Sequence, residues 1–196
     1  MKQATRGFTL VEVAIVLVII GVLLGGVLKG QELINNARVK NLANELRSTQ
    51  TAVFAFQDKF RALPGDYASA SSTWSAGTPA ANGDGNGVIA GAETTEAWDH
   101  LRRAGLLTGS GPAAPTNTFG GAMSIGATSA ADFATGMPGS VRVCTGNVPG
   151  PLARQIDIAM DDGSATAGNV RAVIGSASGP GTAYDENSAF TVCLSF

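Results

Sequence analysis

The sequence has few of the residues that catalytic sites usually need. It contains one histidine, His100, and two cysteines, and no segment matches a P-loop or a G-x-S-x-G nucleophile motif. A lone histidine in a predicted helix is more often packed or on the surface than catalytic. These absences give no indication of an enzyme, and we expect that the chain is not one.

Neither sign of charge is in clear excess. The 196 residues include 13 Lys and Arg and 15 Asp and Glu, which gives a formal net charge of −2 at pH 7. A balance so close to neutral does not suggest nucleic acid or an anionic surface as a required partner. We therefore expect no obligate nucleic-acid partner.

Charge and proline are both nearly missing from the N-terminal part of the chain. Proline first occurs at position 64, and Glu12 is the only charged residue between positions 8 and 28. A helix over these residues would span the roughly 30 Å core of a bilayer. Residues 1–7 are short, polar and basic, so they should stay in the cytoplasm while the C-terminal body is exported. A cleaved secretory signal is the alternative, but its apolar core is usually only about 7 to 15 residues long and ends in an A-x-A-like site, which is missing here.

The junction between the basic leader and the apolar run has a specific pattern, formed by Gly7, Phe8, Thr9, Leu10, Val11 and Glu12. It resembles the leader of type IV prepilins, in which a short basic peptide and a glycine precede Phe-Thr-Leu-x-Glu at the start of a hydrophobic helix. The resemblance implies cleavage after Gly7 by a prepilin peptidase and N-methylation of the new Phe8 amine. It also implies assembly into a filament by an inner-membrane assembly platform, together with other copies, pilins or pseudopilins.

Glu12 is costly in a membrane helix, although less so near the interface and at the positive end of the helix dipole. In the filament that the resemblance implies, the apolar helices would bundle and the buried carboxylate would need a partner. We expect this partner to be the Phe8 amine of a neighbouring subunit, so that the pair sets the axial register. The alternative is an acid that is merely tolerated at a helix start.

Beyond the apolar run, the pattern becomes amphipathic. Apolar residues recur mainly at intervals of three to five, at Leu33, Ile34, Ala37, Leu42, Leu46, Val53 and Phe56. Without an internal proline, one helix is predicted from about Leu10 to Phe56. We expect residues 8–28 to form its membrane or filament-core half and residues 29–62 an amphipathic half packed on a globular domain, residues 63–196.

An acidic, glycine-rich loop occupies residues 82–93. It follows the calcium-loop pattern D-x-[DN]-x-[DN]-G-x5-E, with Asn at the first position, and the candidate ligands are Asn82, Asp84, Asn86, the Val88 carbonyl and Glu93. We expect a weakly bound, structural Ca²⁺. A helix that starts at Thr94 or Thr95 and stops at Gly105 should follow the loop, and no convincing helix precedes it. The alternative is an Asn/Gly/Asp turn without an ion.

The C-terminal part contains four strand-like runs, residues 140–146, 155–160, 169–175 and 189–196, which predict an antiparallel sheet. Cys144 and Cys193 lie in the first and last runs, and in an exported domain such a pair favours a disulfide over a metal site or two reduced thiols. The disulfide would stabilise the domain by roughly 4 kcal/mol. The resemblance to type IV pilins points the same way, because these proteins often close a C-terminal region with a disulfide. Here that region would be residues 144–193.

These observations predict an α+β, type IV pilin-like fold with a long N-terminal helix packed on a small antiparallel sheet. The first interpretation is a structural subunit of a pilus-like helical filament. Before assembly it would cross the inner membrane once with a periplasmic C-terminal domain, and afterwards it would lie in an extracellular pilus. The alternative is a pseudopilin of a type II secretion system in a periplasmic pseudopilus, a class in which some members have a calcium-supported loop. A second alternative is a membrane-anchored, calcium-dependent binding module that keeps Met1.

Overall fold

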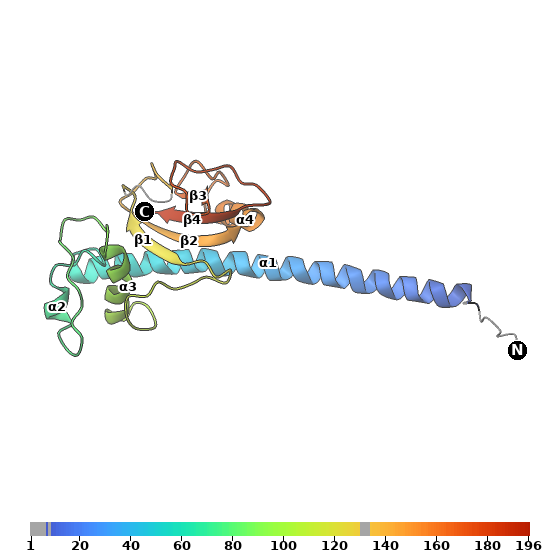
Figure 1. Cartoon of the computed structure of the whole chain (residues 1–196), viewed down its shortest axis with the longest axis horizontal. Helices are drawn as coiled ribbons and strands as arrows, with labels where there is room; N and C mark the ends of the chain where they lie inside the picture. Colours follow the sequence, from blue (N-terminus) through green and yellow to red (C-terminus); the bar gives the residue numbers. More distant parts are fainter. Residues whose placement is uncertain (1–6, 8, 130–133) are drawn as a thin grey trace, which may run out of the picture. The chain divides into compact units, whose positions relative to one another are not determined.

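The computed structural model describes residues 7, 9–129 and 134–196 (Figure 1). The chain divides into two compact units, residues 1–38 and residues 39–196. Helix α1, Leu10–Phe60, contributes to both units and is unbroken, as the absence of proline predicts. It ends where Arg61 adopts a positive φ of 55° and Pro64 follows.

In the second unit, three shorter helices and four strands follow α1. The helices are α2, Ala70–Thr73, α3, Glu93–Arg103, and α4, Gly150–Met160; the strands are β1, Met123–Ala127, β2, Val141–Pro149, β3, Val170–Ile174, and β4, Ala189–Ser195. The strands form one antiparallel sheet in the order β1-β2-β4-β3. The sheet lies along the C-terminal part of α1 (Figure 1), and this arrangement confirms the expected α+β fold.

The sheet has two apolar faces, because side chains alternate along each strand. Val143 of β2 and Val192 of β4 belong to the main core, together with Leu42, Leu46 and Phe56 of α1. The neighbouring positions point the other way and form a second, small cluster of Cys144, Val173 and Cys193 with Ala134 and Met137. The α1 face of the sheet therefore provides the main packing surface.

The buried stripe of α1 is shorter than the sequence predicts. It begins at Val39, whereas Leu33 and Ile34 are 61% and 55% exposed, and Ala37 is also exposed. The apolar periodicity upstream of Val39 is real, but its side chains are exposed in the described part of the chain. A surface apolar pattern alone cannot distinguish a face buried within one chain from a face left for other molecules.

Two segments of the C-terminal part differ from the prediction. Residues 155–160, predicted as a strand, belong to α4, because Pro151 sits in its first turn and Leu152, Ala153 and Ile156 face the core at helical spacing. The other difference is β1, which the sequence pattern did not reveal in its glycine- and alanine-rich surroundings. The other three strand-like runs do form β2, β3 and β4.

Candidate functional sites

Glu12 caps the start of α1. The backbone N–H and the hydroxyl of Thr9 both donate to Oε2 of Glu12, at 2.8 and 2.7 Å, and the Glu12 N–H donates to Oγ1 of Thr9 at 3.3 Å. Thr9 directly precedes the helix, so the two residues form a reciprocal capping box. The T-x-x-E spacing could have revealed this role in the sequence. Gly7 is exposed beside it, and Phe8 lies outside the described residues.

The apolar side chains of the first unit are uncovered in the single chain. Every Leu, Ile and Val between positions 10 and 28 is 48% to 86% exposed. An 18-residue window of α1 has a mean hydropathy of 2.8, and α1 is the one helix in the described ranges that is long and apolar enough to cross a membrane. So much contiguous apolar surface requires lipid or other helices around it. This segment is consistent with membrane anchoring.

A third carboxylate, from outside the acidic loop, lies beside the two acids that the motif includes. Oxygens of Asp66, Asp84 and Glu93 lie within 4.8 Å of one another. Asp66 comes from the turn after α1 and is 3% exposed. A Cβ at Gly83 would lie 2.3 Å from the Asp66 backbone, so only glycine permits this approach. Asp66 was missed because it lies upstream of the loop and outside its spacing.

Backbone amides and neighbouring side chains hold these carboxylates. Asp66 accepts from the N–H of Asn86 at 3.0 Å and from that of Gly87 at 2.8 Å. Oε1 of Glu93 accepts from the N–H of Asp84 at 3.0 Å, and Oε2 accepts from Ala90 at 3.1 Å. None of the ion pairs in the described part of the chain includes these three acids. The cluster thus has amide donors but no cationic side chain to balance its charge.

The remaining predicted ligands have other contacts. Oδ1 of Asn82 accepts from the N–H of Ser71 at 2.7 Å, and Oδ1 of Asn86 accepts from that of Val88 at 2.7 Å. The Asn86 amide group donates to Asp84 at 2.8 Å. Ile89 is fully buried in the main core and anchors the loop to it. The loop thus brings Asp84 and Glu93 together with Asp66, while Asn82 contacts the α2 segment.

His100 joins the two backbone segments that lead into the acidic cluster. The Gly65 N–H donates to Nδ1 at 2.9 Å, so Nε2 carries the proton and donates to the Ala81 carbonyl at 2.8 Å. The ring is fully buried and lies nearly parallel to that of Phe56, with 6.1 Å between the centroids. Burial lowers the pKa of His100. The single histidine is therefore a packed residue. By binding Gly65 and Ala81, it holds the adjacent residues Asp66 and Asn82 in place.

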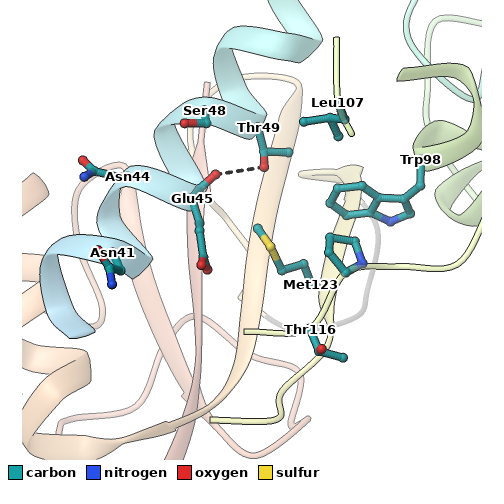
Figure 2. A pocket seen from close by; sticks show the side chains of 10 residues that line it. Asn41, Asn44, Glu45, Ser48, Thr49, Trp98, Leu107, Thr116 and Met123 are labelled. Atoms are coloured by element: carbon teal, nitrogen blue, oxygen red, sulfur yellow. Dashed lines mark hydrogen bonds between the residues drawn. The ribbon is translucent and has the colours of Figure 1, made fainter. Parts of the chain in front are cut away.

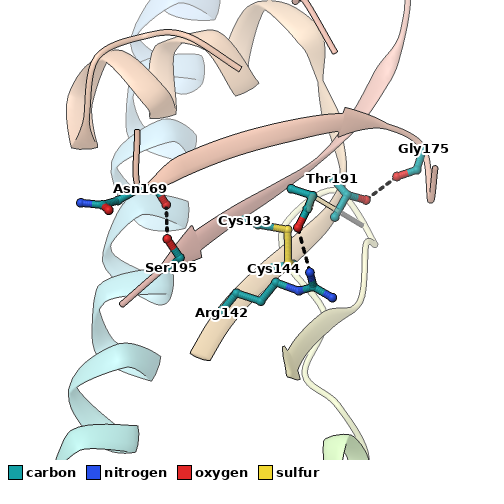
Figure 3. The surroundings of a disulfide bond; sticks show 8 residues. Arg142, Cys144, Asn169, Gly175, Thr191, Cys193 and Ser195 are labelled. Carbon is teal, nitrogen blue, oxygen red and sulfur yellow. Dashed lines mark hydrogen bonds between the residues drawn. A yellow bond between two sulfur atoms is a disulfide. The ribbon is translucent and has the colours of Figure 1, made fainter. Parts of the chain in front are cut away.

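Cys144 and Cys193 form a disulfide between the two central strands (Figure 3). They are directly opposite each other in the β2–β4 register and are 1% and 0% exposed. Nearby, the Thr191 hydroxyl donates to the Gly175 carbonyl and the Ser195 hydroxyl to the Asn169 carbonyl. The predicted cross-link thus lies in the second apolar cluster.

A second acidic cluster was not predicted. Asp157, Asp161 and Asp162 lie at the end of α4 with oxygens within 4.8 Å of one another. Burial raises the pKa of Asp157, which accepts from the Tyr184 hydroxyl at 2.7 Å and from the Gly163 N–H at 3.0 Å. This cluster therefore ties the end of α4 to the segment before β4.

Comparison with known proteins identifies the N-terminal segment. Residues 2–28 match the family model described as the prokaryotic N-terminal methylation motif. No curated protein and no solved structure matches the chain. The motif is typical of type IV pilins and type II pseudopilins, which are generally non-enzymatic structural proteins, and it implies peptidase processing and filament assembly. The chain is a prepilin-like protein with the N-terminal methylation motif of these two groups.

Proposed function

We propose that the chain is a structural subunit of a type IV pilus-like filament. The observation that carries the proposal is the methylation motif at residues 2–28, which continues into a helix whose apolar side chains are uncovered in the single chain. Before assembly, lipid of the inner membrane would cover this surface, with the C-terminal domain on the periplasmic side. After assembly, the helices of other subunits would cover it.

Processing would create the second half of an assembly contact. Cleavage after Gly7 releases the Phe8 amine, which would be methylated and would face Glu12 of a neighbouring subunit. The Glu12 carboxylate has two oxygens, and the capping hydrogen bonds from Thr9 reach only Oε2. One carboxylate can therefore cap its own helix and still accept from a neighbouring amine.

The N-terminus of the mature protein tests this proposal. We expect mass spectrometry of the protein from its native membranes to identify N-methylated Phe8 as the first residue, and electron microscopy to show surface fibres that contain the chain. A chain that keeps Met1 would exclude both filament proposals and would support the membrane-anchored binding module.

A pseudopilin of a type II secretion system is the second candidate function. The acidic cluster favours this candidate. The sequence resemblance extends to pseudopilins, and some of them have a calcium-supported loop. A processed N-terminus without surface fibres, together with loss of protein secretion when the chain is deleted, would support this candidate over the pilus subunit.

The acidic loop would bind a structural Ca²⁺ in either type of filament. The carboxylates of Asp66, Asp84 and Glu93 supply the hard oxygen ligands that Ca²⁺ prefers, and the loop offers further carbonyl oxygens such as that of Val88. Asn82 and Asn86 could join them only by giving up their present contacts with Ser71 and Val88. The bound ion would balance three close negative charges and hold the loop to the turn after α1.

Thermal unfolding with and without Ca²⁺ tests this site. For a dissociation constant of about 10⁻⁴ to 10⁻³ M, 10 mM Ca²⁺ should stabilise the protein by about 1.4 to 2.7 kcal/mol. Asp66→Asn should abolish the response, whereas Asp58→Asn, at an exposed acid of α1, should keep it. Equal melting curves of the wild type in Ca²⁺ and in chelator would exclude a structural ion.

A further inference from the structure

A pocket of about 430 Å³ opens beside the C-terminal half of α1 (Figure 2). One wall is α1 itself, and the other walls include Trp98 of α3, Leu107, Pro115 and Met123 of β1. All these residues belong to the second unit. The volume lies within the usual range of ligand pockets and leaves room for one long side chain.

Glu45 gives this apolar pocket an acidic group. Its Oε2 is buried and has no hydrogen-bond partner within the described ranges. The nearby Thr49 hydroxyl donates to the Glu45 backbone carbonyl at 2.9 Å, and in Figure 2 the carboxylate points away from it. Burial also raises the pKa of Glu45. A buried oxygen without a donor is unfavourable, so the pocket is suited to a group that supplies one.

The chemistry of the pocket matches a lysine side chain. The aliphatic stem of a lysine can pack along apolar walls such as those of Leu107 and Met123, while its ammonium group donates to a carboxylate. An apolar ligand alone would leave the Glu45 oxygen unsatisfied. An anion would be repelled by the ionised carboxylate.

We propose that this pocket receives Lys40 from a second copy of the chain. Among the described lysines, Lys29 pairs with Glu32 at 2.6 Å and Lys59 lies 5.2 Å from the centre of the Phe60 ring. Lys40 is exposed and has neither kind of contact with the described residues. It is therefore the lysine best able to enter a neighbouring pocket.

The positions of Lys40 and Glu45 favour an open-ended assembly. Residues five positions apart on a helix are separated by about 140° around its axis, so the lysine and the pocket lie on different faces of α1. A contact between two different surface patches is heterologous and repeats into a ring or an open filament, whereas a twofold dimer would use one patch twice. This inference rests on the proposed filament function and assigns a second contact to it, away from the N-terminus.

Zero-length cross-linking of the full-length protein, both in membranes and in sheared fibres, tests the contact directly. A carbodiimide should couple the Glu45 carboxylate to the Lys40 amine, and a mixture of ¹⁴N- and ¹⁵N-labelled chains should give the mixed-isotope peptide that proves an intermolecular bond. Because the chain has few lysines, each product is distinguishable by mass. Absence of the mixed Glu45–Lys40 peptide, or coupling of Glu45 to another lysine in its place, would overturn the proposal.

Charge reversal provides the second test. Glu45→Lys and Lys40→Glu should each lower the amount of assembled filament at least about tenfold, because each places like charges in contact. The double variant, which carries both substitutions, should restore a large part of the filament yield. Lys59→Glu, at an exposed lysine of the same helix, should assemble like the wild type. Single variants with normal assembly, or a double variant no better than the singles, would contradict the Lys40–Glu45 contact.

The two tests separate this contact from the proposed function. If the wild type forms fibres and both charge-reversal variants assemble equally well, the filament proposal stays intact and the contact is excluded. A cross-linked Glu45–Lys40 pair in a protein that never forms a filament would support the contact and exclude the filament function.

Discussion

At the scale of single residues, Glu12 combines two roles that mutagenesis can separate. Its carboxylate caps α1 through Thr9 in the described chain, and the proposed filament requires its charge to meet the Phe8 amine of a neighbour. Capping depends on hydrogen-bond acceptors and survives replacement by Gln, whereas pairing with an amine depends on the negative charge. The choice of substitution therefore decides which role is tested.

We predict that Glu12→Gln assembles poorly although it keeps the cap. Filament yield, measured in sheared fractions, should fall at least about tenfold in Glu12→Gln and in Glu12→Ala. Thr9→Ala loses about 0.5–2 kcal/mol of capping energy but keeps the charge, so its yield should stay near the wild type. Membrane insertion and cleavage after Gly7 are checked in each variant. Normal assembly of Glu12→Gln would show that the charge of Glu12 is not needed for assembly and that the residue only caps the helix.

His100 makes stability depend on pH. Burial lowers its folded-state pKa below the unfolded value of about 6.5, so the unfolded chain binds a proton first as the pH falls. Stability from this residue is therefore complete above about pH 6.5 and decreases below it, down to the folded-state pKa, by at most about 1.4 kcal/mol per pH unit. Protonation of Nδ1 would also remove the hydrogen bond from Gly65.

Urea unfolding in chelator between pH 7.5 and 5.5 measures this effect. The wild type should lose stability over this range, and His100→Gln, although less stable at pH 7.5, should lose less. Burial raises the pKa of Asp157 and Glu45, which gives a pH dependence of opposite sign, but these groups are common to both proteins. Identical slopes for the two proteins would show that His100 does not titrate in this window.

Single residues also show where sequence reasoning reaches its limit. The Thr9–Glu12 cap follows a local spacing and is readable in the sequence, and so is the loop that holds Asp84 and Glu93. Asp66 joins these acids only because the chain folds back after α1, with Gly83 allowing close approach. The partners of His100 are backbone groups, which no residue pattern can specify. Local chemistry is predictable here, and long-range contacts are not.

At the scale of elements, the disulfide links β2 and β4, the central strands of the sheet. The closed loop has a sequence separation of 49 residues, so the cross-link should contribute about 4 kcal/mol by restricting the unfolded chain. We predict that the double variant Cys144→Ala, Cys193→Ala folds to the same sheet but loses about 2–5 kcal/mol in urea unfolding. Reducing agent should destabilise the wild type and leave the variant unchanged. Equal unfolding midpoints of wild type and variant would contradict this role.

Other elements explain why part of the sheet was predictable. In β2, β3 and β4, polar and apolar residues alternate because one side of each strand faces α1. Residues 155–160 alternate as well, yet they fold as part of α4, because Pro151 starts a helix and Leu152 and Ile156 lie four positions apart on its buried side. A six-residue alternation is too short to outweigh helix-start signals upstream of it.

At the scale of the whole molecule, the two units differ in what they need in order to be stable. All buried residues in the described part of the chain lie at or after Val39, so residues 39–196 contain a complete core. The apolar side chains before Leu28 are exposed and contribute to no packing within the described chain. The first unit should therefore determine membrane residence and assembly, and the second should determine folding stability.

We predict that a fragment of residues 39–196 folds by itself and unfolds cooperatively, whereas residues 61–196 do not fold. The shorter fragment loses Leu42, Leu46, Val53 and Phe56, which are fully buried in the main core. Burial of each contributes about 1.5–3 kcal/mol, and their combined loss is comparable with the 5–15 kcal/mol stability of a typical domain. Circular dichroism melting and amide dispersion in NMR spectra measure the outcome. Adding a peptide of residues 39–60 should restore folding of the shorter fragment, whereas independent folding of residues 61–196 would show that the sheet does not require α1.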